Sequence, residues 1–158
     1  MNSSHRKSVI IVDDDKFYTK LLTQLLAENL DRPVIAFLNP KEALAALPRL
    51  DVGMIVTDYE MPELNGFEFI AEARKVVPSA NFILITGHPI TPAMEEQMKA
   101  LPVKAVLAKP FTWRKLCDEI IRFWPTSSLN PFVGTSFPGN PAAVRAASPS
   151  SASNPTSA

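Results

Sequence analysis

The stretch VIIVDDD, residues 9–15, is a run of four β-branched residues that ends in three consecutive aspartates. Further short apolar runs follow it, and a segment with helical periodicity separates each run from the next. The five strand candidates are Val9–Val12, Val34–Phe37, Gly53–Thr57, Phe82–Thr86 and Ala105–Ala108. Because short buried runs that alternate with helices are typical of a parallel sheet, the sequence predicts an α/β fold, a three-layer α/β/α sandwich.

The segments between the strands carry helix signals. The first has a broad apolar stripe made of residues four apart and their neighbours, namely Phe17, Leu21, Leu22, Leu25 and Leu26. Asn39-Pro40 and Thr91-Pro92 each place a capping side chain before a proline at the first helical position, which predicts the starts of two more helices. The remaining helices are expected from about Gly66 to before Pro78, and from about Phe111 to Phe123.

The charge balance argues against some classes of partner. The chain has 158 residues, with 16 basic and 16 acidic side chains and a formal net charge of zero. This gives no electrostatic attraction to nucleic acid or to an anionic membrane, so we expect no direct nucleic-acid binding. No run approaches the roughly 20 apolar residues of a membrane span, so we expect no membrane segment and a cytoplasmic location. The single cysteine, Cys117, lies on an apolar helical stretch and is expected to be buried.

Composition divides the chain into three parts. Residues 1–7 are expected to be an N-terminal extension, and residues 8–124 are expected to be one α/β domain. From Pro125 to Ala158 the sequence is dominated by Pro, Ser, Ala and Gly, with Arg145 as its only charged side chain. Such a segment buries too little apolar surface to offset its chain entropy, so residues 125–158 are expected to be a disordered tail or a linker.

Polar side chains follow four of the predicted strands. They are Asp13, Asp14 and Asp15 after the first strand, Asp58 after the third, Thr86 at the end of the fourth and Lys109 after the fifth. The carboxyl ends of parallel strands share one edge of the sheet, which is where such folds bind ligands. Carboxylates gathered there repel one another unless a cation lies among them, and hard oxygen ligands suit Mg²⁺, or Mn²⁺ in its place.

A metal, a lysine and a hydroxyl at one edge suit phosphoryl transfer, because together they position the phosphoryl group and neutralise charge on its oxygens. An aspartate can itself be the nucleophile and form an acyl phosphate. Asp58 is the best placed for this role, since it follows the central predicted strand. A turn with Pro62, Asn65 and Gly66 shapes the loop beyond it.

Each of these residues also has a plain structural explanation. Asp15 can cap the helix that follows it, Lys109 can be a solvated lysine, and Thr86 can bond to backbone at a strand end. His88 is expected to be an exposed loop residue, since no second histidine or cysteine lies near it to share a soft metal. The joint occurrence of such groups at four strand ends favours a functional site.

Four segments together resemble the receiver domain of bacterial response regulators, over roughly Ser8 to Trp124. They are VIIVDDD (9–15), MIVTDYEMPELNGFEFI (54–70), FILITGH (82–88) and VLAKPF (106–111). The resemblance implies a five-stranded parallel sheet in the flavodoxin-like order 2-1-3-4-5, as in chemotaxis receivers. It also implies a cis peptide bond between Lys109 and Pro110.

The resemblance assigns roles to the residues at the sheet edge. The set that acts on the phosphoryl group would be Asp58 as its acceptor, Thr86 and Lys109. The metal ligands would be the acidic pair Asp13 and Asp14, together with Asp58 and the backbone carbonyl of Glu60. The side chains of Glu60 and His88 would modulate the lifetime of the acyl phosphate.

Receivers accept a phosphoryl group from a phosphohistidine of a sensor histidine kinase or a histidine phosphotransfer protein, and act as a switch or relay in two-component signal transduction. The resemblance therefore implies a signalling phosphoacceptor that catalyses only its own phosphorylation and dephosphorylation, with homodimer formation left open. Val106 departs from the family, which usually has Tyr or Phe there. A β-branched side chain has little rotamer freedom, so a signal is expected to leave through the loop after Thr86 instead.

Three alternatives remain at this point. A haloacid-dehalogenase-type phosphatase would use Asp13 and Asp15 as its DxD pair, but would leave the Asp58 loop unexplained. A pseudo-receiver would act only as a docking module, although such modules typically lack an acidic residue or the lysine. A flavin carrier would share the architecture, but the sequence has no Ser/Thr/Gly-rich phosphate loop after the first strand.

Overall fold

A computed structural model describes residues 6–125 of the chain. The strands are β1 (Ser8–Val12), β2 (Val34–Phe37), β3 (Val52–Asp58), β4 (Asn81–Thr86) and β5 (Val103–Ala108). The helices are α1 (Lys16–Asn29), α2 (Pro40–Ala46), the 3-10 turn η1 (Leu47–Arg49), α3 (Gly66–Val76), α4 (Pro92–Lys99) and α5 (Trp113–Phe123). All five expected strands form, and four of them are slightly longer than predicted. Most of the expected terminal segments, residues 1–5 and 126–158, lies outside the described residues.

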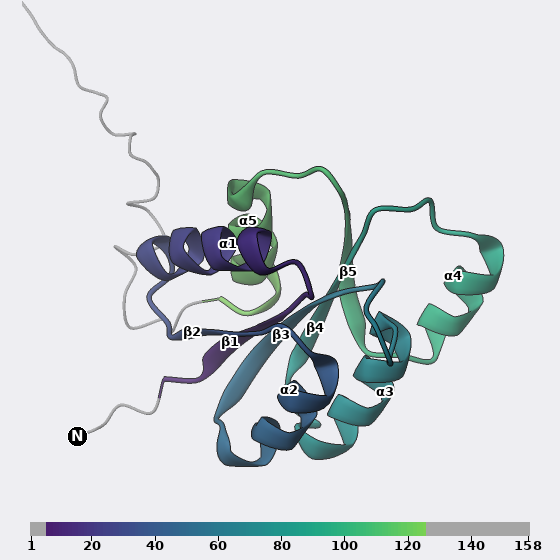
Figure 1. Cartoon of the computed structure of the whole chain (residues 1–158), viewed down its shortest axis with the longest axis horizontal. Coiled ribbons are helices and arrows are strands. Elements are labelled where there is room, and N and C mark those ends of the chain that lie inside the picture. Colours follow the sequence, from purple (N-terminus) through teal and green to yellow (C-terminus); the bar gives the residue numbers. More distant parts are fainter. Residues whose placement is uncertain (1–5, 126–158) are drawn as a thin grey trace, which may run out of the picture. The chain divides into compact units, whose positions relative to one another are not determined.

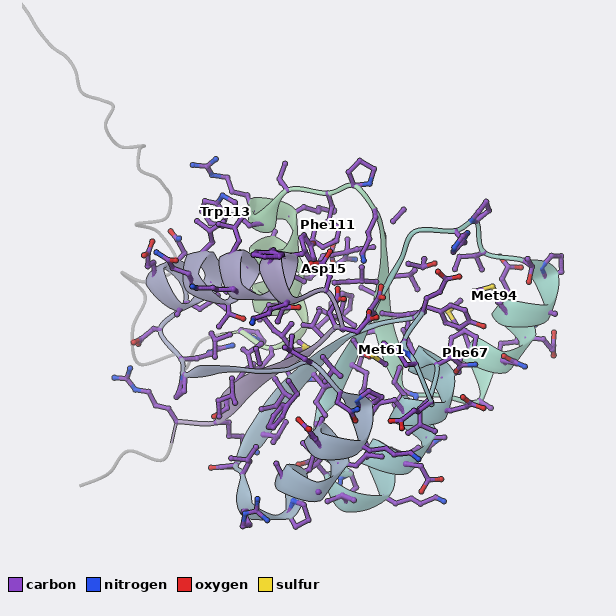
Figure 2. The ribbon with its side chains drawn as sticks, viewed as in Figure 1. Asp15, Met61, Phe67, Met94, Phe111 and Trp113 are labelled. Carbon is purple, nitrogen blue, oxygen red and sulfur yellow. The ribbon has the colours of Figure 1, made fainter. Side chains whose placement is uncertain are left out.

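The strands form one parallel sheet in the order β2-β1-β3-β4-β5, which confirms the predicted fold class and strand order. Figure 1 shows α1 and α5 on one face of this sheet and α2, α3 and α4 on the other. Each face has its own apolar core. Phe111 and Trp113 lie on the α1–α5 side, whereas Met61, Phe67 and Met94 lie on the α3–α4 side (Figure 2).

Alternation along the buried strands supplies both cores. In β1, Val9 and Ile11 belong to the core beneath α1 and α5, while Ile10 and Val12 belong to the core beneath α2 and α3. Every residue of β1 and β3 is buried, because helices cover both faces of a parallel sheet. The sequences of the central strands are therefore nearly continuous apolar runs, and the polar residues lie at the strand ends.

Polar caps set the helix starts as the sequence predicted. The Asn39 side chain accepts from two backbone N–H groups of α2, and Thr91 caps α4. Asn65 and Glu68 form a reciprocal capping box at the start of α3. The last helix begins at Trp113 rather than near residue 111, because Thr112 provides its cap.

The apolar stripe expected on α1 is only partly buried. Leu22 and Leu26 reach the core, but Phe17 is 82% exposed and Leu21 is 57% exposed. Thr19 takes a place on the buried face, where its hydroxyl donates to the backbone carbonyl of Asp13 over 3.1 Å. That hydrogen bond and the cap at Asp15 fix the rotation of α1, so the stripe is wider than the face that the sheet can cover.

The amino ends of the strands are closed by aromatic packing. The Trp124 ring lies so close to Gly53 that a Cβ there would come within 2.2 Å of it. The guanidinium carbon of Arg32 lies 3.8 Å from the centroid of the same ring, and Arg32 donates to the Trp124 carbonyl over 2.6 Å. Asn81 donates to the neighbouring Phe123 carbonyl over 3.3 Å. These contacts join the end of α5 to β3 and β4.

One smaller expectation is also settled by the fold. Cys117 is buried in the core, and burial raises the pKa of its thiol to about 12, with the Asp118 charge as a further cause. Between residues 6 and 125, no helix combines the length and the apolar character that crossing a membrane requires.

Candidate functional site at the carboxyl edge of the sheet

Backbone hydrogen bonds carry the strand pairing one step past the strands, and so place the polar residues side by side. The N–H of Asp13 donates to the Phe37 carbonyl over 3.2 Å, and the N–H of Lys109 donates to the Thr86 carbonyl over 2.8 Å. Asp58 is the last residue of β3 and pairs in register with Ile85. Backbone hydrogen bonds of the sheet thus position Asp13, Asp58 and Lys109.

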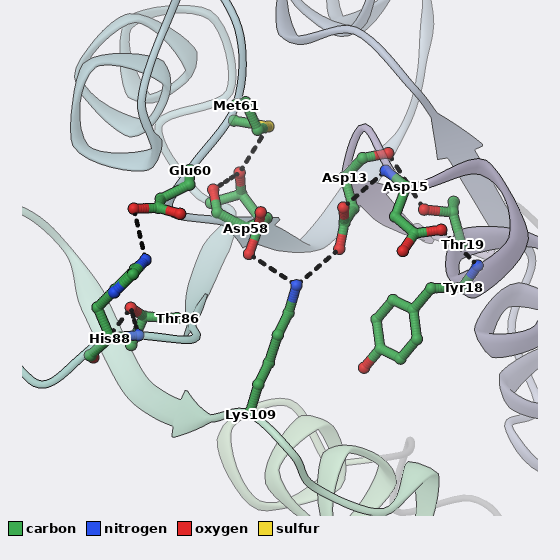
Figure 3. A network of polar contacts seen from close by, with 11 residues as sticks. Asp13, Asp15, Tyr18, Thr19, Asp58, Glu60, Met61, Thr86, His88 and Lys109 are labelled. Carbon is green, nitrogen blue, oxygen red and sulfur yellow. Dashed lines mark hydrogen bonds and ion pairs between the residues drawn. The ribbon is translucent and has the colours of Figure 1, made fainter.

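Lys109 joins two of the predicted carboxylates. Its Nζ lies 3.2 Å from Asp58 Oδ1 and 3.5 Å from Asp13 Oδ2, as Figure 3 shows. The two carboxylate side chains are almost fully buried, at 8% and 4% exposed, and the lysine side chain is 32% exposed. Residues at the carboxyl ends of β1, β3 and β5 therefore meet at one point, as the sequence predicted.

Burial and mutual repulsion make these carboxylates reluctant to ionise. Burial, and then the charge of Asp13, raise the pKa of Asp58 to about 6, even though Lys109 opposes the shift. Burial also raises the pKa of Asp13. For Lys109, burial lowers the pKa, but the charges of Asp13 and Asp58 outweigh it and leave the pKa above its ordinary value.

Three carboxylates form a cluster that can hold a metal ion. One oxygen from each of Asp13, Asp14 and Asp58 lies within 4.8 Å of the other two. Asp13 Oδ2 is buried and, among the described residues, makes no hydrogen bond, although the Lys109 ammonium is its ion-pair partner at 3.5 Å. Asp15 is not in the cluster, because its side chain accepts from the Tyr18 N–H over 3.0 Å as the cap of α1. The capping explanation for Asp15 is therefore confirmed.

Thr86 is buried at the end of β4, and its hydroxyl is bonded to the loop that follows. Its Oγ1 accepts from the His88 N–H over 3.0 Å and donates to the His88 carbonyl over 3.2 Å. The exposed His88 ring lies against Glu60, with 2.7 Å between Nε2 and Oε2. A metal contact from Glu60 would thus come from its backbone carbonyl, as the resemblance implies.

The loop after Asp58 turns back tightly on itself. The Gly66 N–H donates to the Tyr59 carbonyl over 2.7 Å, and a Cβ on Gly66 would lie 2.8 Å from the Asp58 carbonyl oxygen. Glycine is needed here because the backbone approaches too closely for a side chain. Within the same loop, Glu63 has a φ of 76°, in the left-handed region that L-residues with side chains rarely adopt. This edge of the sheet therefore holds backbone strain as well as buried charge.

Tyr18 is a neighbour of Lys109 that the sequence interpretation missed. The Lys109 ammonium lies 5.3 Å from the centroid of the Tyr18 ring. Burial, followed by the charges of Asp13, Asp58 and Asp15, raises the pKa of the Tyr18 hydroxyl to about 12. The only available signal was the place of Tyr18 in the first turn of the helix that follows the aspartates. The peptide bond between Lys109 and Pro110 is cis, as expected.

Comparison with known proteins now identifies the family. The response regulator receiver domain profile matches residues 9–121, which is most of the chain. The chain belongs to the response regulator receiver family. It is a receiver domain of the kind found in two-component systems.

Relatives and solved structures agree with this assignment. The chain is 32% identical over 109 residues to a response regulator receiver protein of Anaeromyxobacter, and the match covers 69% of this chain and 45% of that protein. It is 30% identical over 114 residues to the chemotaxis protein CheY of Thermotoga maritima, covering 72% of this chain and 94% of CheY. A CheY-like receiver domain from Methanospirillum hungatei superposes with a TM-score of 0.68 at 25% identity, over 75% of this chain and 93% of that one. The chain thus spans less than half of the first of these relatives and nearly all of CheY.

Proposed function

We propose that this receiver accepts a phosphoryl group on Asp58 from a phosphohistidine of a sensor histidine kinase or a histidine phosphotransfer protein. The observation that carries the proposal is the meeting of Asp58 with Lys109, at 3.2 Å, beside the carboxylates of Asp13 and Asp14. A nucleophile, a positive charge and a cation site then stand together at the open edge of the sheet. Phosphoryl transfer needs such positioning and charge neutralisation.

In the proposed reaction, an Asp58 carboxylate oxygen attacks the phosphorus atom of the donor. A phosphorus–oxygen bond forms as the phosphorus–nitrogen bond breaks, and its electron pair stays on the imidazole. The Lys109 ammonium offsets negative charge on the phosphoryl oxygens, and the Thr86 hydroxyl is the neutral donor that can turn toward one of them. The buried setting of Asp58 strengthens these electrostatic contacts because little water screens them.

The residues present fit a divalent cation. Asp13, Asp14, Asp58 and the Glu60 carbonyl supply only oxygen ligands, and the Asp13 oxygen left without a hydrogen bond among the described residues suits a metal contact. A bound Mg²⁺ would neutralise the carboxylates and the phosphoryl oxygens. Without such a cation, two buried carboxylates repel both each other and an anionic donor. We therefore expect phosphorylation to require a divalent metal.

We further propose that α4 carries the response to phosphorylation. None of the residues of this fully described helix is buried, so little packing energy opposes its movement. When the Thr86 hydroxyl turns toward a phosphoryl oxygen, it gives up both hydrogen bonds to His88, which lies in the connection between β4 and α4. Val106 is partly buried in the core on the α3–α4 side, and a fixed β-branched side chain offers no ring to reorient.

The proposal is tested by treating the protein with acetyl phosphate and Mg²⁺ and following its intact mass. We expect one phosphoryl group per chain, trapped at Asp58 by borohydride, and no label when a chelator is present. Asp58→Asn should abolish labelling, whereas Asp51→Asn, at the exposed position just before the same strand, should leave it unchanged. Stoichiometric labelling of Asp58→Asn would overturn the assignment.

Two other outcomes would point to different functions. Sustained turnover of a phosphate ester would favour a phosphatase, and Mg²⁺ binding without any labelling would favour a docking module. For the response of α4, we expect a beryllofluoride mimic to change amide chemical shifts mainly from Gly87 into α4. Equally large changes throughout β5 and α5 would contradict this route.

A further inference from the structure

The ring of Tyr18 is held in place independently of Lys109. The Tyr18 N–H is bonded to Asp15 in the cap of α1, which fixes the backbone at the first helical turn. Its ring meets the Phe111 ring edge to face, with 6.2 Å between centroids and an interplanar angle of 84°. The ring is therefore supported from α1 and from the loop that precedes α5, and it lies beside the Lys109 side chain (Figure 3).

The distance between Lys109 and this ring lies within the range of a cation–π interaction. The ammonium is 5.3 Å from the ring centroid, and the attraction extends to about 6 Å. Lys109 is partly shielded from water, at 32% exposed, which strengthens the attraction relative to a surface pair. A lysine side chain has four flexible carbons, so a contact of this kind reduces the number of places its charge can occupy.

The ring contact differs from the other two contacts of Lys109. The ion pairs to Asp13 and Asp58 use oxygens that a metal or a phosphoryl group would also engage. The face of the Tyr18 ring offers no oxygen ligand to a hard metal ion and does not attract an anionic phosphoryl group, so neither group displaces it from the ammonium. It can hold the ammonium at the site when its carboxylate partners are otherwise occupied.

We propose that Tyr18 is a positioning residue, whose ring face holds the Lys109 ammonium where the phosphoryl group arrives. The proposal rests on the proposed function of Asp58. It assigns the effect to the aromatic face and not to the hydroxyl. A purely structural role, in which the ring only fills space beside Phe111, predicts that any side chain of suitable size would serve.

Two substitutions separate these explanations. Tyr18→Phe keeps the aromatic face and removes the hydroxyl, whereas Tyr18→Leu keeps an apolar side chain and removes the face. Trp113→Leu is the matched control, because Trp113 packs against the same core and has its own cation, Arg114, 4.7 Å from its ring. Circular dichroism and thermal melting check that each variant is folded.

The main measurement is the labelling rate with acetyl phosphate, as the maximal rate and the half-saturating donor concentration. We expect Tyr18→Leu to lower the maximal rate about three- to tenfold, with metal affinity unchanged, because the attraction it removes is of that size. Tyr18→Phe should recover the wild-type rate, and Trp113→Leu should match wild type. Equal rates in the Tyr18→Phe and Tyr18→Leu variants would overturn the proposal.

A spectroscopic measurement without phosphoryl transfer distinguishes this proposal from the proposed function. The Lys109 side-chain methylene protons nearest the ammonium should show an upfield ring-current shift in the wild type and in Tyr18→Phe, which Tyr18→Leu abolishes. Absence of that shift in the wild type would overturn the Tyr18 contact, even if Asp58 is labelled normally. Failure of the wild type to be labelled would instead remove the proposed function, and with it the positioning role.

Discussion

The two ends of the sheet are built in opposite ways. At the amino end, Trp124 packs against the Gly53 backbone and beneath the Arg32 guanidinium, and the Asn81 side chain is bonded to the end of α5. At the carboxyl end, buried carboxylates repel one another around Lys109, and the loop beyond Asp58 contains a left-handed residue. One end combines apolar contact with satisfied hydrogen bonds, and the other combines burial with charge and strain.

We therefore expect the amino end of the sheet to contribute mainly to stability and the carboxyl end mainly to function. Packing at the amino end should stabilise the fold without contributing to chemistry, because these contacts lie at the opposite end of β3 from Asp58. Buried charge at the carboxyl end should lower stability, since a protein pays to desolvate a charge unless partners compensate. Substitutions at the two ends are therefore expected to have opposite effects on the free energy of unfolding.

The largest effect is expected for Trp124→Ala at the amino end. Removing the ring loses its packing on Gly53 and its contact with Arg32, and should lower the free energy of unfolding by about 3 kcal/mol. Urea denaturation measures this loss. The fraction of folded molecules labelled at Asp58 should not change.

A second variant shows whether that loss comes from the ring contact itself. Gly53→Ala puts a methyl group where the Trp124 ring lies, and should cost about 1–3 kcal/mol on its own. In a Trp124→Ala background the same change should cost much less, because the obstructing ring is gone. Simple additivity of the two losses would show that the ring and Gly53 do not interact in solution.

Asp58→Asn should have the opposite effect on stability in the metal-free protein at pH 7. The pKa of Asp58 is raised to about 6, so above that pH the folded state holds a charge that the unfolded state carries more easily. Removing the charge should raise the free energy of unfolding by on the order of 2 kcal/mol. Asp118→Asn, on the exposed face of α5, is the matched control and should change it by less than about 0.5 kcal/mol.

The stability difference between Asp58→Asn and wild type should depend on pH, in a direction set by the raised pKa of Asp58. As the pH falls from 7 through about 6 toward the ordinary pKa of 3.8, the folded state binds a proton before the unfolded state does. Protonation of Asp58 therefore raises the free energy of unfolding of the wild type as the pH falls over this range. The greater stability of Asp58→Asn relative to wild type should shrink accordingly. Urea denaturation of both proteins at pH 7.5 and pH 5, in the presence of a chelator, measures how their free energies of unfolding differ. An advantage that is the same at both values would refute the raised pKa.

The sequence predicts the core of the candidate site because topology alone brings it together. Asp13, Asp58, Thr86 and Lys109 each lie at the end of a strand or directly after it, and the carboxyl ends of parallel strands meet at one edge whatever the details of packing. Caps at Asn39 and Thr91 were equally predictable, since each is a local interaction between a side chain and nearby backbone. Features that depend on adjacency in the chain or on strand order could be predicted.

Contacts between distant side chains could not be predicted in this way. Arg32 and Trp124 lie 92 residues apart, and neither has a local pattern that selects the other. The contact of Tyr18 with Lys109 depends on how α1 is rotated, which the Thr19 hydroxyl helps to fix. The left-handed backbone at Glu63 also gave no signal, because glutamate is not a residue type that favours it.

Smaller effects are expected from substitutions of Asp14 and Asp15, which are adjacent in the chain but have different environments. Asp14→Ala should weaken Mg²⁺ binding about tenfold, because it removes one of three clustered carboxylates, and should change stability by less than about 0.5 kcal/mol. Asp15→Ala should do the reverse, losing about 1 kcal/mol as the cap of α1 while leaving Mg²⁺ affinity nearly unchanged. Calorimetric titration and urea denaturation measure the two quantities. Equal losses of metal affinity would place Asp15 among the ligands.

The smallest effect concerns strain in the loop beyond Asp58. Glu63 has a φ of 76°, and its carboxylate accepts a 3.3 Å hydrogen bond from the Asn39 side chain. Glu63→Gly and Glu63→Ala both remove that hydrogen bond, but only glycine adopts this backbone conformation without a Cβ penalty.

The comparison between these two variants isolates the strain. The left-handed conformation costs an L-residue about 1–2 kcal/mol, and the greater freedom of glycine in the unfolded chain returns part of that difference. Glu63→Gly should therefore be more stable than Glu63→Ala by about 0.5–1 kcal/mol in urea denaturation. A Glu63→Ala variant as stable as Glu63→Gly would mean that the loop relaxes out of the left-handed region at no cost. The carboxyl end would then owe its lower stability to buried charge alone, and the contrast with the amino end would be electrostatic and not conformational.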